Sequence, residues 1–126
     1  MVGQLKDILI VDDEPAIAAL LADMLRDEGY LVRTCHDGAT ALLEIFRQPP
    51  SLVVLDVAMP VMLGSDLLEY LRKRGFADLP VIMMTAGVNP KQYLAQGANA
   101  VVSKPFDLDQ MLLTVQQQLA RPSAAG

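Results

Sequence analysis

Residues 8–15 have the sequence Ile-Leu-Ile-Val-Asp-Asp-Glu-Pro, and they give the clearest indication of the fold class. Its four consecutive apolar residues leave no polar face, which is typical of a central parallel strand covered by helices on both sides. Pro15 suits the first turn of a helix, because that position needs no backbone N–H. The stretch therefore predicts a buried strand that runs into a helix, with three acids at the junction.

Similar short apolar runs alternate with amphipathic stretches along the rest of the chain. Residues 52–55 and 81–84 are apolar throughout, so they predict two further central strands. In residues 31–35 the apolar pattern is interrupted by Arg33 and Thr34, which places this strand at an edge of the sheet. A fifth strand is expected at about residues 100–103. This rhythm predicts an α/β fold, with βα units around a parallel sheet.

Capping and breaking residues delimit the helices between these strands. The first helix is expected from Pro15 to Gly29, the second at residues 39–47, and the third from Gly64 to Gly75. Asn89 and Pro90 are expected to cap a fourth helix that Gly97 ends after barely two turns. Asp107, with Gln110 as its capping-box partner, is expected to begin a last helix that ends before Pro122.

Apolar residues at helical spacing predict the buried face of each helix. The residues expected to be buried are Ile17, Leu20, Leu21, Met24 and Leu25 in the first helix; Leu42, Ile45 and Phe46 in the second; Leu67, Leu68 and Leu71 in the third; and Leu108, Met111, Leu112, Val115 and Leu119 in the last.

Length and composition exclude several classes of protein. The 126 residues suffice for one domain, expected at residues 4–120, with residues 121–126 as a tail or the start of a linker. A net charge of −5 without any run of Lys or Arg argues against direct binding to nucleic acid or to an anionic membrane. The single cysteine, Cys35, cannot form an intramolecular disulfide, and no apolar run could span a membrane. A cytoplasmic protein is expected.

Polar residues follow the predicted strands at the points where the strands end. Because the carboxyl ends of parallel strands share one edge of the sheet, these residues should lie close together. Clustered carboxylates repel one another unless a cation lies among them, and their oxygen atoms suit Mg²⁺. A lysine and a threonine beside an aspartate would serve phosphoryl transfer to that aspartate. The residues concerned are Asp12, Asp13, Glu14, Asp56, Thr85 and Lys104.

Five short motifs in this order make the chain resemble the receiver domain of two-component response regulators. The motifs are Val11-Asp-Asp-Glu-Pro15, Asp56-Val-Ala-Met-Pro60 with Gly64, Thr85-Ala86, Gly97-Ala98 and Lys104-Pro-Phe106. The resemblance runs from Asp7 to about Leu119. It implies a flavodoxin-like (βα)5 fold, a three-layer sandwich with strand order 2-1-3-4-5.

The resemblance also implies a role for each residue of the motifs. Asp56 would accept a phosphoryl group from a sensor histidine kinase or a histidine phosphotransfer protein. Asp13, Asp56 and the backbone carbonyl of Ala58 would bind Mg²⁺, and Asp12 would act mainly through a metal-bound water. Thr85 would bind a phosphoryl oxygen and draw its loop inward. Lys104, expected before a cis proline, would pair with Asp56 and later with the phosphoryl group.

The chain departs from the family pattern at three places. Val101 occupies a position that is usually aromatic, so the usual aromatic switch is missing. Lys104 follows Thr85 by 19 positions, about three fewer than usual, which removes close to one turn of the fourth helix. Ala58 and Gly87 carry no polar group that could orient an attacking water, so no side-chain help with self-dephosphorylation is expected from them.

Three functions compete for this pattern. The first is a signalling domain that regulates a partner protein or output domain, and a homodimer is possible. The second is a phosphatase of the haloacid-dehalogenase type, but Ala58 stands where that chemistry needs a second aspartate. The third is a constitutive interaction module that keeps the site and has lost the switch, as Val101 and the short fourth helix suggest.

Overall fold

Five parallel strands form the centre of the protein, and helices cover both faces of the sheet. The computed structural model describes residues 6–87 and 89–121. The strand order is β2-β1-β3-β4-β5, so the α/β class, the parallel sheet and the edge position of β2 are confirmed. The strands are β1 (Asp7–Val11), β2 (Leu31–Cys35), β3 (Leu52–Asp56), β4 (Val81–Thr85) and β5 (Ala100–Ser103).

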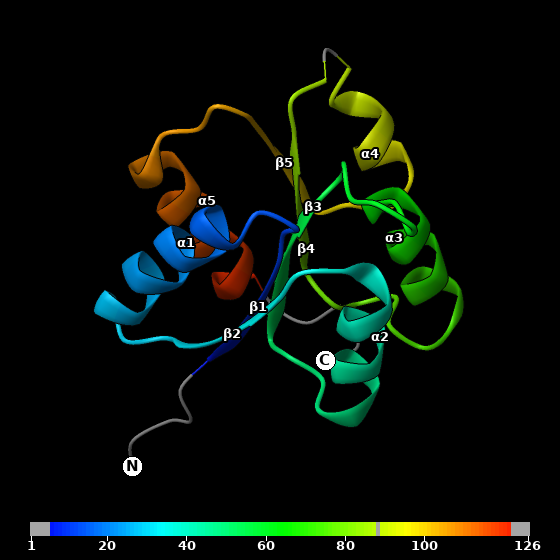
Figure 1. Ribbon diagram of the computed structural model, residues 1–126, viewed down its shortest axis with the longest axis horizontal. Coiled ribbons are helices and arrows are strands. Elements are labelled where there is room, and N and C mark those ends of the chain that lie inside the picture. The colour runs from blue at the N-terminus through cyan, green and yellow to red at the C-terminus, as the bar shows by residue number, and fades with distance from the viewer. Residues whose placement is uncertain (1–5, 88, 122–126) are drawn as a thin grey trace.

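The helices form two layers, with α1 and α5 on one face of the sheet and α2, α3 and α4 on the other (Figure 1). They are α1 (Pro15–Asp27), α2 (Gly38–Arg47), α3 (Gly64–Lys73), α4 (Lys91–Ala95) and α5 (Leu108–Ala120). Within the described ranges, none of the helices is long and apolar enough to cross a membrane. The expected boundaries at residue 4 and at Pro122 lie outside the described residues.

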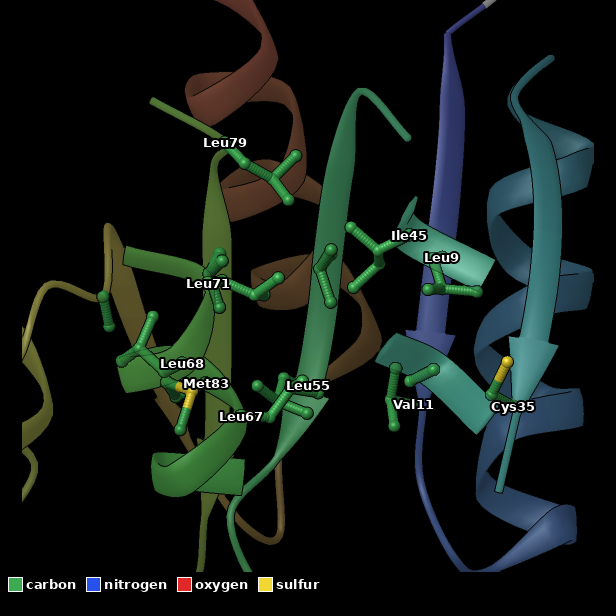
Figure 2. Packing of buried hydrophobic residues seen from close by; sticks show 14 of the residues in the cluster. Leu9, Val11, Cys35, Ile45, Leu55, Leu67, Leu68, Leu71, Leu79 and Met83 are labelled. Carbon is green, nitrogen blue, oxygen red and sulfur yellow. The ribbon is translucent and has the colours of Figure 1, made fainter. Parts of the chain in front are cut away.

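Two hydrophobic clusters, one on each face of the sheet, hold these layers together. Every residue of β3 and β4 is buried, as expected for central strands. Leu9 and Val11 of β1 point toward α2 and α3, where they join the cluster around Leu55 and Leu71 (Figure 2). Each fully buried leucine or isoleucine stabilises the fold by roughly 2 kcal/mol relative to an exposed one.

Small residues occupy more of the helix–sheet contact than the apolar spacing predicted. Leu20 and Phe46, both expected to be buried, are each 48% exposed, so these two predictions are wrong. Ala18 and Ala22 in α1 are buried instead, because small side chains allow the helix to lie close to the sheet. Phe46 packs edge-on against the rings of Tyr70 and Phe76, at 6.3 and 5.2 Å between centroids. The remaining residues of the expected stripes are buried or partly buried against the two clusters.

The ends of the helices mostly follow the expected signals. Gly29 and Gly97 follow α1 and α4 with positive φ angles of 95° and 111°. The expected cap by Asn89 is wrong, because Pro90 holds the N-cap position of α4 and no side chain caps that end. Asp107 caps α5 by accepting a hydrogen bond from the N–H of Asp109. The beginning of α4 thus lacks the side-chain cap that the sequence predicted.

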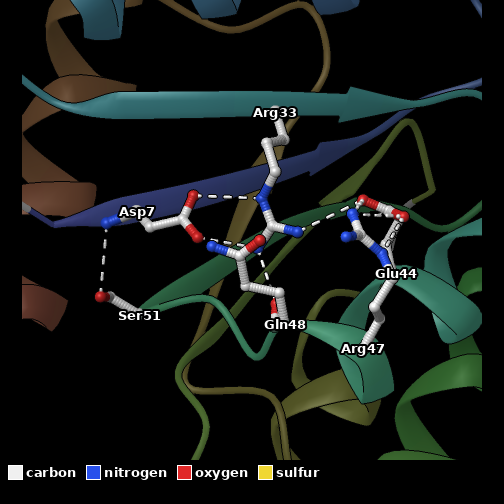
Figure 3. A network of polar contacts seen from close by, with 6 residues as sticks. All are labelled: Asp7, Arg33, Glu44, Arg47, Gln48 and Ser51. Atoms are coloured by element: carbon white, nitrogen blue, oxygen red, sulfur yellow. Dashed lines mark hydrogen bonds and ion pairs between the residues drawn. The ribbon is translucent and has the colours of Figure 1, made fainter.

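Arg33, which the sequence placed on an exposed edge, ties β2 to its neighbours (Figure 3). Its guanidinium lies 2.7 Å from the carboxylate of Asp7 in β1 and 3.3 Å from that of Glu44 in α2. It also donates a hydrogen bond to the carbonyl of Gln48. The arginine therefore fastens the edge strand to both the sheet and a covering helix, near the amino-terminal end of β1 and so away from Asp12 and Asp13, which follow its other end.

Candidate functional site

Three carboxylates meet at the carboxyl edge of the sheet. Asp12 and Asp13 follow β1 directly, and Asp56 is the last residue of β3, the strand that pairs with β1. One ligand oxygen from each lies within 4.8 Å of the others. Asp12 is fully buried and Asp56 is 3% exposed. The sequence prediction that these acids gather at one edge is confirmed.

Lys104 supplies the positive charge nearest to this cluster. Its Nζ lies 3.2 Å from Oδ1 of Asp56 and 3.4 Å from Oδ2 of Asp12. Its backbone N–H donates a hydrogen bond of 2.7 Å to the carbonyl of Thr85, and the peptide bond to Pro105 is cis, as the resemblance implied. The contact with Asp12 was not foreseen, because a strand-end position does not say which neighbours a long side chain reaches.

The charges in the pocket shift the pKa values of its members. Burial, together with the negative charge of Asp12, raises the pKa of Asp56 from 3.8 to about 6, although Lys104 opposes the shift. Burial alone would lower the pKa of Lys104, but the attraction of Asp56 and Asp12 raises it. The single lysine does not balance the three carboxylates of Asp12, Asp13 and Asp56. The pocket therefore keeps an excess of negative charge, which favours a bound cation.

Thr85 lies at the end of the neighbouring strand β4, where it is 4% exposed. Its Oγ1 accepts a hydrogen bond of 2.9 Å from the N–H of Gly87. A Cβ at position 87 would come within 3.1 Å of this oxygen. The hydroxyl is thus linked directly to the segment that leads to α4.

The loop between β3 and α3 folds back over the end of β3. Gly64 donates a hydrogen bond of 2.9 Å to the carbonyl of Val57, and a Cβ at Gly64 would lie 2.2 Å from the carbonyl oxygen of Asp56. Val61 has a φ of 71°, and the N–H of Met62 donates a hydrogen bond of 2.8 Å to the carbonyl of Pro60. These two features define a γ-turn centred on Val61. This compact loop places exposed Ala58 beside Asp56, whose Oδ1 accepts from the Ala58 N–H at 3.4 Å.

Two further residues, His36 and Cys35, lie near the cluster. His36 is exposed, and its Nδ1 lies 3.0 Å from the carbonyl oxygen of Asp12, where the ring nitrogen must act as the donor. Cys35 is buried, as expected, and burial raises the pKa of its thiol. His36 thus contacts the main chain beside the site, and no sequence pattern predicted this contact.

The comparison with protein families identifies the family of the domain that carries this site. The family model described as the response regulator receiver domain matches residues 8–116, most of the chain. The chain belongs to the response regulator receiver family. Receiver domains are signalling domains of two-component systems, so the resemblance drawn from the five motifs is confirmed, and with it the flavodoxin-like strand order.

The curated relatives of this receiver domain are longer regulators. Probable transcriptional regulatory protein TcrX of Mycobacterium tuberculosis is 38% identical over 122 residues, which cover 94% of this chain and 52% of the relative. Nitrogen assimilation regulatory protein NtrX of Azorhizobium caulinodans is 38% identical over 118 residues, which cover 90% of this chain and 26% of the relative. The receiver domain spans about half the length of such relatives, or less.

Solved structures support the same assignment. A putative response regulator from Chloroflexus aurantiacus has a TM-score of 0.89 at 32% identity, covering 94% of this receiver domain and 100% of that chain. The chemotaxis protein CheY4 of Vibrio cholerae has a TM-score of 0.84 at 32% identity, covering 90% of this receiver domain and 98% of that chain.

The departures from the family pattern are visible in this receiver domain. Val101 is partly buried and packs against the cluster on the α2, α3 and α4 face. Helix α4 has only five residues, Lys91–Ala95, so the expectation of a short fourth helix is confirmed. A β-branched side chain in this packed position lacks the ring that an aromatic switch would turn.

Proposed function

We propose that this receiver domain accepts a phosphoryl group on Asp56 from a phosphohistidine of a sensor histidine kinase or a histidine phosphotransfer protein. The observation that carries the proposal is the position of Asp56, buried at a strand end between Lys104 and the carboxylates of Asp12 and Asp13. Burial and the charge of Asp12 raise its pKa, as is common for functional carboxylates. Membership of the receiver family supports the same reaction.

The donor set fits a hard divalent cation. Asp13 and Asp56, with the backbone carbonyl of Ala58, would hold Mg²⁺, and Asp12 would act mainly through a metal-bound water. Three carboxylates against one lysine leave an excess of negative charge that such an ion would offset. When bound, Mg²⁺ would supply charge neutralisation for the phosphoryl oxygens.

Each neighbouring side chain has a defined task in the proposed reaction. A carboxylate oxygen of Asp56 would form the new bond to phosphorus as the bond from phosphorus to the donor imidazole breaks, and the imidazole would keep that electron pair. The ammonium of Lys104, now 3.2 Å from Asp56, would then pair with the phosphoryl oxygens. The Thr85 hydroxyl would donate to one of these oxygens and draw the segment around Gly87 inward.

A small phosphodonor tests the proposal without a partner protein. With acetyl phosphate and Mg²⁺, intact-mass spectrometry should show the addition of one phosphoryl group, which is lost on treatment with hydroxylamine. The adduct should be absent with EDTA and in Asp56→Asn. An adduct that persists in Asp56→Asn would contradict the assignment of the phosphoacceptor, and a full yield in EDTA would contradict the metal requirement.

The proposed output is the regulation of a partner protein or of an output domain. The two relatives described above are named as transcriptional and nitrogen assimilation regulators, which supports an output domain that acts on gene expression. We place the receiver domain at residues 4–120 and propose that it works in the cytoplasm without direct contact to nucleic acid or membrane. A homodimer is compatible with this role.

A constitutive interaction module is the second candidate function. Val101 and the five-residue α4 favour it, because neither provides the usual route from the site to the surface. Beryllofluoride, which mimics the aspartyl phosphate, distinguishes the two candidates in amide NMR spectra recorded with Mg²⁺. Shift changes confined to the loops around Asp56 would favour the constitutive module, whereas changes that reach α4 would favour a switch.

The lifetime of the aspartyl phosphate should depend on position 58. Ala58 is exposed beside Asp56 and has no group that could orient water, so Ala58→Asn should speed the loss of the phosphoryl group by about tenfold. The decay of the phosphorylated form is followed by intact mass after removal of acetyl phosphate. Adding Gly87→Glu should increase the decay rate further but by a smaller factor, because the new Cβ would crowd the Thr85 hydroxyl. An unchanged decay rate in Ala58→Asn would refute the influence of position 58 on dephosphorylation.

A further inference from the structure

One side chain of α3, Arg72, fastens the far end of α4 to the body of the domain. Its guanidinium donates three hydrogen bonds, each to a different partner. Nε donates to the carbonyl of Gly97 at 3.0 Å, Nη1 to the carbonyl of Phe76 at 2.6 Å, and Nη2 to Oδ1 of Asn99 at 2.9 Å. Gly97 and Asn99 belong to the loop that joins α4 to β5, so this one residue connects two segments 25 or more positions apart.

The partners of Arg72 are themselves fixed. Oδ1 of Asn99 also accepts from the N–H of Val81 at 2.9 Å, and the N–H of Asn99 donates to the carbonyl of Val81. The arginine stem lies directly over Gly97, where a Cβ would come within 3.2 Å of Arg72 Cγ and Nε. All three acceptors are neutral, and burial lowers the pKa of Arg72. Such a half-buried guanidinium requires these acceptors, so the loop has little freedom to leave them.

The other end of α4 has no side-chain cap. Two backbone hydrogen bonds form its first turn, from the N–H of Gln92 to the carbonyl of Asn89 at a long 3.4 Å and from the N–H of Tyr93 to the carbonyl of Pro90 at 3.1 Å. Ala86 and Gly87 are exposed. Gly87 is nevertheless tied to the candidate site, because its N–H donates to the hydroxyl of Thr85. Arg72 therefore holds the last turn of α4, whereas its first turn follows in the chain from the segment that is bonded to Thr85.

We propose that Arg72 makes the C-terminal end of α4 a fixed pivot, so that phosphorylation of Asp56 moves the first turn of α4 and leaves β5 in place. This inference rests on the proposed function of Asp56. It explains how a receiver domain with Val101 in β5 could still signal. The movement begins at the Thr85 hydroxyl, reaches the first turn of α4 through Gly87, and stops at Gly97.

Hydrogen exchange tests the anchor without any phosphorylation. In Arg72→Lys, which keeps the charge and most of the stem, the amides of Ala98 and Asn99 should exchange about tenfold faster because two of the three acceptors lie in their loop. The amide of Val53 in β3 should be unchanged, which shows that the fold is intact. Arg74→Lys is the matched control, since Arg74 is exposed and lies over the ring of Tyr70. Equal exchange of Ala98 and Asn99 in all three proteins would overturn the proposal.

Beryllofluoride with Mg²⁺ tests the pivot itself. In the parent protein, amide shift changes should include Gly87 and Gln92 and should be small from Ala98 to Ser103. In Arg72→Lys they should extend through this second segment, whereas Arg74→Lys should resemble the parent. Changes that already cross Gly97 in the parent, or identical patterns in all three proteins, would overturn the pivot. If no amide beside Asp56 responds in any protein, the phosphoacceptor assignment fails, and hydrogen exchange still decides whether the anchor exists.

Discussion

Asp56→Asn is expected to make the metal-free protein more stable at pH 7, although it removes the proposed phosphoacceptor. The carboxyl group of Asp56 is buried and lies beside the negative charge of Asp12, so its pKa rises from 3.8 to about 6. At pH 7 the folded protein must hold this carboxylate ionised in an unfavourable place. The neutral amide of asparagine removes that cost, and Lys104 keeps Asp12 as a partner at 3.4 Å.

The expected pH dependence follows from the direction of the shift. Well below pH 4, Asp56 is protonated in both the folded and the unfolded protein, and its pKa shift costs nothing. As the pH rises from about 4 to about 6, the folded parent loses up to about 3 kcal/mol of stability relative to the variant, since one pKa unit corresponds to about 1.4 kcal/mol, and the difference levels off above the folded pKa. The stability advantage of Asp56→Asn should therefore grow between pH 4 and pH 7.

Urea unfolding in EDTA, at several pH values, measures this difference. Asp23→Asn, which changes an exposed acid on α1, is the matched control and should show no such growth. Adding Mg²⁺ at pH 7 should stabilise the parent more than Asp56→Asn, because the parent offers one more carboxylate to the ion. A variant that is less stable than the parent at pH 7 in EDTA would contradict the pKa shift.

Gly64→Ala is expected to destabilise the domain by about 3 kcal/mol or more, the largest loss from any of the substitutions considered. The added Cβ would lie 2.2 Å from the carbonyl oxygen of Asp56 and 3.0 Å from its carbonyl carbon. These are backbone atoms, so no side-chain rotation can relieve the overlap. The loop between β3 and α3 would have to move, and Asp56 would move with it.

Gly29→Ala provides the comparison for Gly64→Ala. Gly29 has a φ of 95°, but a Cβ there would meet no atom within 4 Å. Its replacement should therefore cost only the strain of the left-handed conformation, about 1 kcal/mol. Urea unfolding of both variants separates the two effects. Equal losses would mean that the close approach of Gly64 to Asp56 is not what constrains this position.

The local pattern of the sequence was enough to predict the sheet and the location of the site. Residues 8–11, 52–55 and 81–84 are apolar on both faces, and such runs are typical of parallel strands that helices cover on both sides. Their strand ends determined which polar residues would meet, because parallel strands present their carboxyl ends at one edge. Gly97 and the short stretch before it likewise predicted the brief α4. These features depend on neighbours in the chain, which a sequence records directly.

Contacts between distant segments could not be predicted before the elements were packed together. The apolar spacing of α1 and α2 did not reveal that Leu20 and Phe46 would be exposed, because burial depends on how closely each helix lies against the sheet. No pattern indicated that Lys104 would reach Asp12, or that Arg72 would bind the loop beyond α4. A long charged side chain can reach several groups, and the fold determines which of these groups lie within its reach. The order of strands and strand ends along the chain was therefore enough to predict which residues gather at the site, whereas the packing of the elements established which atoms each of them contacts.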